Sequence, residues 1–96
     1  MYFSVSYDIS NNKTRRLAVK LCKQAGLLRL QRSVFTGKSD SSRIRKLEQE
    51  LTPHLQKDTD SLSIQPLNTK AFSALRLIGL HPQKREIARK QWIVFL

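Results

Sequence analysis

The chain has little cysteine, no long apolar run and few acidic residues, and each shortage excludes something. Cys22 is the single thiol in 96 residues, so no intrachain disulfide can form, which favours a reducing compartment. No stretch of about 18 apolar residues is present to span a membrane, and no basic segment followed by an apolar stretch opens the chain. We therefore expect one domain, residues 1–96, that works in the cytoplasm without a membrane.

Acidic residues are also unevenly placed. Lys and Arg number 18 against 7 Asp and Glu, which gives a net charge of +11. Residues 1–35 hold seven bases and one acid, residues 36–60 hold five of each, and residues 61–96 hold six bases and one acid. Two basic ends around a neutral middle favour a protein with one surface turned to a polyanion, most often RNA or DNA. The alternative is a soluble basic protein without such a partner.

The hydrophobic pattern changes its period along the chain. Alternation over residues 2–8 and again over 61–67 predicts strands, whereas helical spacing over 13–25 and 44–55 predicts amphipathic helices. Residues 27–35 fit one strand or two. This order matches the split βαβ pattern. We expect an α+β fold of the ferredoxin-like βαββαβ type, an antiparallel sheet with two helices on one face.

The last third of the chain is less clearly patterned. Residues 71–80 fit a short helical turn or a strand, and Pro66 predicts that the far end of the strand at 61–67 lies at a sheet edge. Residues 79–96 form a basic tail whose final segment, 91–96, is almost wholly apolar. An apolar terminus left exposed would promote aggregation. We expect it to form a C-terminal edge strand, on its own sheet or on another protomer's.

The N-terminal bases form the candidate nucleic-acid-binding surface. The helix at 13–25 contains no Asp or Glu that could pair with its bases at i,i+4 spacing. The bases of this helix therefore repel one another without compensation. Phosphate as the counter-charge explains such an arrangement better than solvent does, although charged helix faces are usually just solvated. The aromatic residues mostly fit the core, so we expect backbone contacts and little sequence readout. The candidate binding residues are Lys13, Arg15, Arg16, Lys20, Lys23, Arg29 and Arg32.

Asp8 is the only acid among those bases, and it ends the first strand although Asp is depleted in strands. One interpretation is structural: the carboxylate caps the next helix or pairs with Arg15 or Arg16. The other is functional: it is a ligand for a cation that phosphate also binds. Asp58 and Asp60 belong to a distant turn, and nothing in the sequence brings them near.

Two motifs resemble the CRISPR-associated protein 2 family. Residues 6–9 are Ser-Tyr-Asp-Ile and residues 31–35 are Gln-Arg-Ser-Val-Phe. Their spacing and the expected topology match the family, and residues 37–51 and 92–95 are similar to it as well. The resemblance therefore extends over nearly the whole chain.

The chain departs from the family pattern in ways that raise its local positive charge. Acidic residues are frequent in the family after the first motif and at residue 38, and an aromatic is common at residue 32. Here those positions hold Asn11, Asn12, Lys38 and Arg32. These departures leave Asp8 in place and could change the preference among nucleic acids.

The resemblance implies a ferredoxin-like protomer that forms a two-fold homodimer, with the C-terminal strand crossing to the partner's sheet. Trp92, Val94 and Phe35 would then contribute to packing at the dimer or its cleft. It also implies metal-dependent phosphodiesterase activity in some members. A further implied role is to bridge two pairs of the CRISPR integrase, CRISPR-associated protein 1.

Metal-dependent cleavage gives Asp8 a role. Mg²⁺ prefers about six oxygen ligands, usually one or two carboxylates with water and phosphate, and another divalent cation such as Mn²⁺ could serve. One chain offers only Asp8 near the motif, so two copies facing across a two-fold axis would form the minimal site. Ser33 is a weaker candidate, because no base is visible that would make it a nucleophile. It could still bond water or metal-bound phosphate.

Three hypotheses follow from these observations. The first is a dimeric, Mg²⁺-dependent endonuclease that acts on RNA or DNA and takes part in integrating new spacers. The second is a non-catalytic, DNA-bridging scaffold of the same complex. The third is a toxin-like ribonuclease of related fold that acts without an integrase. We favour the first, and the chemistry at Asp8 separates it from the second.

Overall fold

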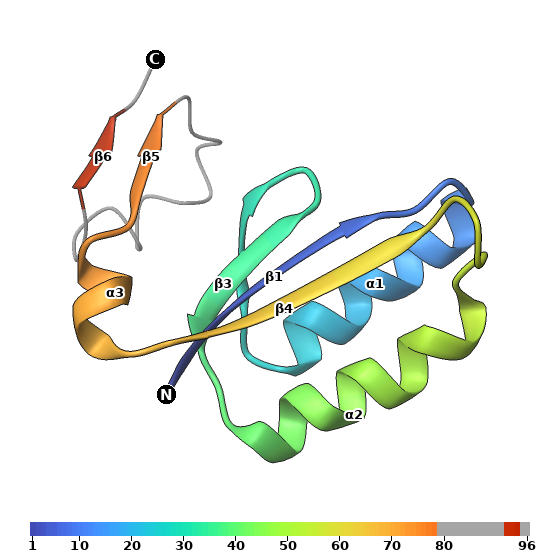
Figure 1. Cartoon of the computed structure of the whole chain (residues 1–96), viewed down its shortest axis with the longest axis horizontal. Coiled ribbons are helices and arrows are strands. Elements are labelled where there is room, and N and C mark those ends of the chain that lie inside the picture. The colour runs from blue at the N-terminus through green and yellow to red at the C-terminus, as the bar shows by residue number, and fades with distance from the viewer. Residues whose placement is uncertain (79–91, 95–96) are drawn as a thin grey trace.

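The computed structural model describes residues 1–78 and 92–94 (Figure 1). A four-stranded antiparallel sheet, in the order β2-β3-β1-β4, carries α1 and α2 on one face. The connectivity from β1 to β4 is βαββαβ, so the predicted ferredoxin-like fold is confirmed. The elements are β1 (Tyr2–Asp8), α1 (Asn12–Gln24), β2 (Leu28–Gln31), β3 (Val34–Lys38), α2 (Ser41–Leu51), the 3₁₀ turn η1 (Thr52–His54), β4 (Ser61–Leu67), α3 (Thr69–Ser73), β5 (Arg76–Ile78) and β6 (Trp92–Val94).

The core lies between the sheet and the two long helices. β1 alternates as predicted: Phe3, Val5 and Tyr7 are buried, and the residues between them belong to the other face. Loss of solvent on burial raises the pKa of the Cys22 thiol to about 12, so this side chain packs as a small hydrophobe rather than serving as a nucleophile. The helices fill the core with Ala18, Leu21, Cys22, Ile44, Leu47 and Leu51.

Side-chain caps begin both helices. The Thr14 backbone N–H donates to Asn11 Oδ1 at 3.1 Å, and the Arg43 N–H donates to Asp40 Oδ1 at 2.8 Å. Gly26 follows α1 at φ +87°, in the left-handed region where a residue with a Cβ is strained. Asn11 rather than Asp8 is therefore the cap of α1.

The segment 27–35 contains two strands, joined by a tight turn. The ladder between β2 and β3 shifts register between Arg29 and Gln31. Leu28 and Leu30, two residues apart, therefore differ in burial: Leu28 is 42% exposed, whereas Leu30 is 2% exposed. A bulge adds one residue to one strand, so simple alternation does not continue through it.

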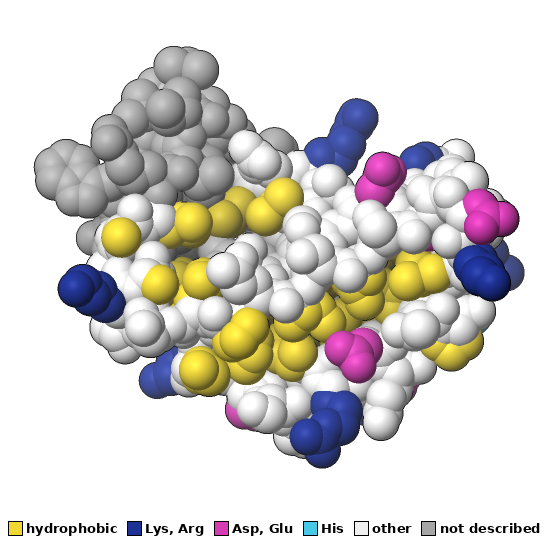
Figure 2. All heavy atoms as spheres, viewed as in Figure 1, with side chains coloured by type: hydrophobic (Ala, Val, Ile, Leu, Met, Phe, Trp, Pro, Cys, Tyr) yellow, Lys and Arg dark blue, Asp and Glu magenta, His cyan; other side chains and the backbone are white. Residues whose placement is uncertain are grey.

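β4 forms one edge of the sheet, as Pro66 predicted. Its half-buried Leu62 and Ile64 pack on the core together with Leu55. A groove of about 450 Å³ follows this edge between β4 and α2, and Figure 2 shows hydrophobic side chains along it. In the described part of the chain, no strand pairs with the outer edge of β4.

Of residues 71–80, those up to 78 are described and include the end of α3 and all of β5, so both structures expected there occur. β6 pairs in parallel with β5 of its own chain, with Leu77 opposite Ile93. The rest of the predicted basic tail, 79–91 and 95–96, lies outside the described residues. Crossing of the tail to a partner's sheet stays a prediction. Among the described helices, none is long and apolar enough to cross a bilayer.

Candidate functional site

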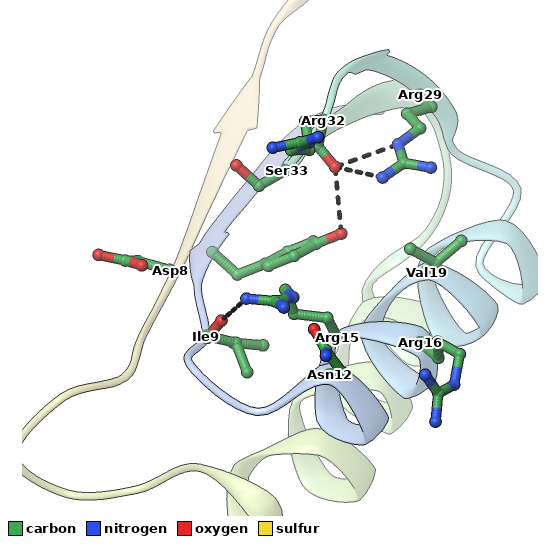
Figure 3. A pocket seen from close by; sticks show the side chains of 10 residues that line it. Asp8, Ile9, Asn12, Arg15, Arg16, Val19, Arg29, Arg32 and Ser33 are labelled. Carbon is green, nitrogen blue, oxygen red and sulfur yellow. Dashed lines mark hydrogen bonds between the residues drawn. The ribbon is translucent and has the colours of Figure 1, made fainter.

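A hollow of about 660 Å³ opens where the end of β1, the start of α1 and the β2–β3 turn meet (Figure 3). Four arginines of the predicted binding surface come together there, two from α1 and two from the β2–β3 hairpin. We call this hollow the arginine pocket. It is lined by Tyr7, Asp8, Ile9, Asn12, Arg15, Arg16, Val19, Arg29, Arg32 and Ser33.

Backbone carbonyls hold two of these arginines without neutralising them. Arg15 Nη1 donates to Ile9 O at 2.9 Å, and Arg29 Nε donates to Arg32 O at 3.1 Å. The Arg29 guanidinium also lies 5.7 Å from the ring centroid of Phe35, in a cation–π contact. A carbonyl oxygen leaves the full positive charge of its partner in place, so both guanidinium groups stay able to bind an anion.

No carboxylate of the described residues pairs with any arginine of the pocket. The one ion pair in that part of the chain joins Arg43 and Asp40, at 2.9 Å. A concave hollow lined by four arginines and one acid, Asp8, keeps an excess of positive charge that attracts phosphate. The other predicted binding residues, Lys13, Lys20 and Lys23, are exposed on α1 and do not line the pocket.

Asp8 contributes to the wall of this pocket, but its carboxylate points away from the arginines (Figure 3). Alternation along β1 is the reason, because Tyr7 faces the core and Asp8 faces the opposite side. Asn11 caps α1, and no ion pair to Arg15 or Arg16 forms. Both structural interpretations of Asp8 are therefore wrong within the described residues, and the carboxylate is exposed.

The side of the sheet that Asp8 faces is the one opposite α1 and α2 (Figure 1), and we call it the outer face. At the far end of β1 from Asp8, Phe72 of α3 stacks on Tyr2 of this face, with ring centroids 3.9 Å apart. Short polar side chains of the central strand β1 and the edge strand β4 alternate onto it. In the ladder, Asp8 is opposite Ser61 and Ser6 is opposite Ser63. Asp8 therefore lies at one corner of a polar stretch of this face that a second sheet could approach.

The acids near Asp8 do not form a metal site within one chain. Among the residues described, no group of three or more His, Cys, Asp or Glu side chains could hold a metal ion. An exposed carboxylate oxygen is a ligand that Mg²⁺ accepts, but Mg²⁺ requires further oxygens. The site is thus chemically suitable and, in a single chain, incomplete.

Asp60 lies close to the end of β1, contrary to the expectation of a distant turn. Pairing of β4 with β1 places Ser61 opposite Asp8. Asp60 therefore lies beside the loop that follows β1. Its Oδ1 accepts from Ser10 N at 3.1 Å, and its Oδ2 accepts from Gln56 N at 2.9 Å. These hydrogen bonds lower the pKa of the Asp60 carboxyl, and the bond from the Gln56 backbone has the largest effect. The carboxylate is fully engaged in tying two loops together.

Replacing Asp60 with Asn should lower the melting temperature at neutral pH, because an amide nitrogen cannot accept the bond from Gln56. The native carboxyl has a lowered pKa, so its contribution is present above the unfolded pKa, about 3.9, and is lost as pH falls through the native one. Melting curves of the two proteins should therefore converge in acid. Asp58→Asn is the matched control, and a gap independent of pH would contradict the assignment.

Tyr7 has a role that the sequence did not reveal. Its ring is buried and stacks near Phe35, with centroids 6.4 Å apart, as a core aromatic should. Its hydroxyl reaches the arginine pocket and lies 3.5 Å from Arg32 O, a long hydrogen bond. Burial raises the pKa of the Tyr7 hydroxyl, which keeps the proton available for donation. The hydroxyl of a buried Tyr generally needs a hydrogen-bond partner. This need was the one signal in the sequence that could have indicated the position of the Tyr7 hydroxyl.

The remaining predicted residues fall in three places. Ser33 lines the arginine pocket, and the pocket contains no His that could act as its base. Phe35 is fully buried in the core, as a packing residue should be, and a part in lining a dimer cleft stays a prediction. Trp92 and Val94 belong to β6, and their side chains lie outside what the structure describes.

Comparison with known proteins agrees with this fold. A model of the family described as CRISPR associated protein Cas2 matches residues 1–74. A protein of Pyrobaculum aerophilum named CRISPR-associated endoribonuclease Cas2 2 is 29% identical over 86 residues, which cover 90% of this chain and 94% of that one. A protein of the same name from Chloroflexus aurantiacus is 30% identical over 74 residues, covering 77% and 87%.

Two crystal structures are also similar. Cas2 of Streptococcus pyogenes superposes with a TM-score of 0.62 at 29% identity, covering 71% of this chain and 87% of that one. A hypothetical protein of Thermus thermophilus, TT1823, has the same TM-score at 30% identity, covering 70% and 80%. The chain therefore belongs to the CRISPR associated protein Cas2 family.

Proposed function

We propose that this protein is a dimeric, nucleic-acid-binding phosphodiesterase of CRISPR adaptation that takes part with the CRISPR integrase in the integration of new spacers. The observation that carries the proposal is Asp8, an exposed carboxylate without an ionic partner among the described residues, on the outer face beside a pocket of arginines. The names of the relatives from Pyrobaculum aerophilum and Chloroflexus aurantiacus, both endoribonucleases, support the reaction class.

Asp8 needs a second carboxylate, and a second copy of the chain is the nearest source of one. Two protomers whose outer faces meet across a two-fold axis bring their Asp8 residues together, because symmetry doubles whatever lies near the axis. Mg²⁺ or Mn²⁺ held there would supply an activated water and neutralise charge at phosphorus. The residues of this chain would position the strand, with the arginine pocket and α1 binding its phosphates.

The open edge of β4 supports a dimer that exchanges its C-terminal strands. An edge strand with unpaired N–H and C=O groups accepts an added strand, and the half-buried Leu62 and Ile64 beside it would be covered by one. Residues 91–96 of the partner have the required apolar composition. In this arrangement Trp92 and Val94 pack at the dimer.

Cleavage of end-labelled RNA and DNA in Mg²⁺, in EDTA, and after metal is restored tests the proposal. We expect cleavage that EDTA abolishes and that Mg²⁺ or Mn²⁺ restores, from a protein that sediments as a dimer. Full activity in EDTA, or a monomer that cleaves, would remove the basis for a paired Asp8 site.

A scaffold without catalysis is the second candidate, and the incomplete metal ligand set of one chain favours it. In that case the basic surface bridges integrase subunits on duplex DNA, and Asp8 carries no chemistry. The two candidates differ in whether spacer acquisition survives when cleavage is lost.

Binding should depend steeply on salt, because phosphate contacts release counterions. Replacing the exposed Lys20 of α1 with Gln should reduce the slope of log affinity against log salt concentration by about 0.9 on duplex DNA and about 0.7 on single strands. Lys57→Gln, in the turn before β4, is the control and should leave the slope unchanged. Anisotropy titrations from low to moderate salt measure both, and equal slopes for the two variants would exclude α1 from the interface.

A further inference from the structure

The arginine pocket and the Asp8 carboxylate are on opposite sides of β1 (Figure 3). Tyr7 faces the pocket, and Asp8 faces the outer face, because neighbouring residues of a strand point in opposite directions. A phosphate within reach of the Asp8 carboxylate is therefore not the phosphate that the pocket of the same protomer encloses. The pocket is a separate subsite, and it needs a ligand of its own.

The charge of the pocket exceeds what one internal phosphodiester provides. Four arginines and one acid, Asp8, line it; the Asp8 carboxylate points away from the arginines (Figure 3), and no acid of the described residues pairs with them. The N-terminus of α1 adds to this charge, since its first turn contains no acid and Asn12, Arg15 and Arg16 all line the pocket. Bases near a helix N-terminus oppose the helix dipole, so an anion is the missing partner. A phosphate monoester carries about two negative charges near neutral pH, whereas a diester carries one.

The hydrogen-bond donors and the volume of the pocket also fit a phosphate monoester. Carbonyl bonds hold Arg15 and Arg29 in place, so part of the cost of ordering them is already met. The side chains of Arg16 and Arg32 make no hydrogen bond to the described residues, and the Tyr7 hydroxyl makes only a long one. A hollow of about 660 Å³ is larger than a phosphate ion requires and falls in the range of small-ligand pockets. It has room for a nucleotide.

We infer that the arginine pocket binds the phosphate monoester of a nucleotide, at the end of a nucleic-acid strand or free. This inference rests on the proposed function for its choice of a nucleotide ligand. Internal phosphodiesters bind along the exposed lysines of α1, while the pocket recognises the end. The protein would then distinguish strands by their terminal chemistry rather than by their sequence.

The test compares oligonucleotides of one sequence that carry a 5′-phosphate, a 3′-phosphate or only hydroxyl ends. Affinities for the full-length protein are measured by anisotropy in EDTA, so that cleavage plays no part. One phosphorylated end should bind at least about tenfold more tightly than the hydroxyl form, the gain expected from charge-assisted hydrogen bonds. Equal affinity for all three strands would overturn the inference.

Variants locate the preference. Arg16→Gln combined with Arg32→Gln should remove the advantage of the phosphorylated end, whereas Lys20→Gln should weaken both forms equally. A preference that survives in a folded double variant would place the subsite elsewhere and overturn the assignment. Competition by a nucleoside monophosphate distinguishes a free nucleotide from a strand end as the natural ligand.

The two proposals fail separately. Loss of the end preference with Mg²⁺-dependent cleavage intact removes only the pocket assignment. An end preference in a protein that never cleaves nucleic acid removes the catalytic proposal and leaves the pocket assignment standing.

Discussion

Replacing Asp8 with Asn is expected to reduce Mg²⁺-dependent cleavage by about a hundredfold or more. The amide keeps the shape of the side chain but removes the negative charge that a divalent cation requires. Charge stabilisation by a catalytic metal is worth several kcal/mol, and about 1.4 kcal/mol corresponds to a factor of ten in rate. Affinity for nucleic acid in EDTA should stay the same or rise slightly, because the carboxylate faces away from the arginine pocket.

Asp58→Asn is the matched control, since Asp58 lies in the turn before β4 and ends no strand of the sheet. Dimers that combine one normal and one Asp8→Asn protomer add a sharper comparison. If both carboxylates hold one metal, the mixed dimer should be nearly as impaired as the double variant. A mixed dimer with half the normal activity would indicate that each Asp8 works alone.

Spacer acquisition by the same variant separates catalysis from bridging. Loss of cleavage with acquisition intact would favour the scaffold. Loss of both, in a protein that still binds DNA and forms dimers, would make the chemistry at Asp8 part of the biological role. Unchanged cleavage by Asp8→Asn would refute the catalytic proposal directly.

The second large effect is expected in the core, where Phe35→Ala should lower the free energy of unfolding by about 3–5 kcal/mol. Phe35 is fully buried; its ring stacks near the Tyr7 ring, and the Arg29 guanidinium lies 5.7 Å from its centroid. Truncation loses the burial of the ring and leaves a cavity that the sheet cannot close. Domains of this kind are stable by about 5–15 kcal/mol in total, so the loss would be a large fraction.

Urea unfolding at one fixed protein concentration measures this change, because the stability of a dimer depends on concentration. Leu28→Ala on the neighbouring strand is the control: Leu28 is 42% exposed, and its truncation should cost far less. A loss below about 1 kcal/mol for Phe35→Ala would mean that the site collapses without a cavity. Binding at the arginine pocket should weaken too, since Tyr7 and Arg29 are supported by the same ring.

Local signals in the sequence were enough to predict the fold. Alternation over residues 2–8 placed Tyr7 and Asp8 on opposite faces, and the structure confirms this. The Asn11 side chain and the backbone of Gly26 define the ends of α1 through chemistry that acts within a few residues. Such features depend on neighbours along the chain, so a single sequence contains them.

Features that depend on distant pairing could not be predicted in this way. The proximity of Asp60 to Ser10 follows from the antiparallel register of β1 with β4, over a separation of 50 residues. The bulge between Arg29 and Gln31 depends on how β2 meets β3. The gathering of arginines from α1 and the β2–β3 hairpin into one pocket has the same origin. Composition predicted that these bases bind phosphate, but only the fold shows which of them lie together.

The central position of β1 has a consequence for how this protein can change over evolution. β1 pairs with β4 from Tyr2 to Asp8 and with β3 from Tyr2 to Ser6, and its two faces differ, one buried in the core and the other polar. A substitution alters one side chain, but an insertion of one residue between Tyr2 and Asp8 would exchange the faces of everything beyond it. Asp8 would turn toward the core, and the core aromatic would turn to the surface. Substitutions in the loops leave this register unchanged, whereas a change in the length of β1 does not.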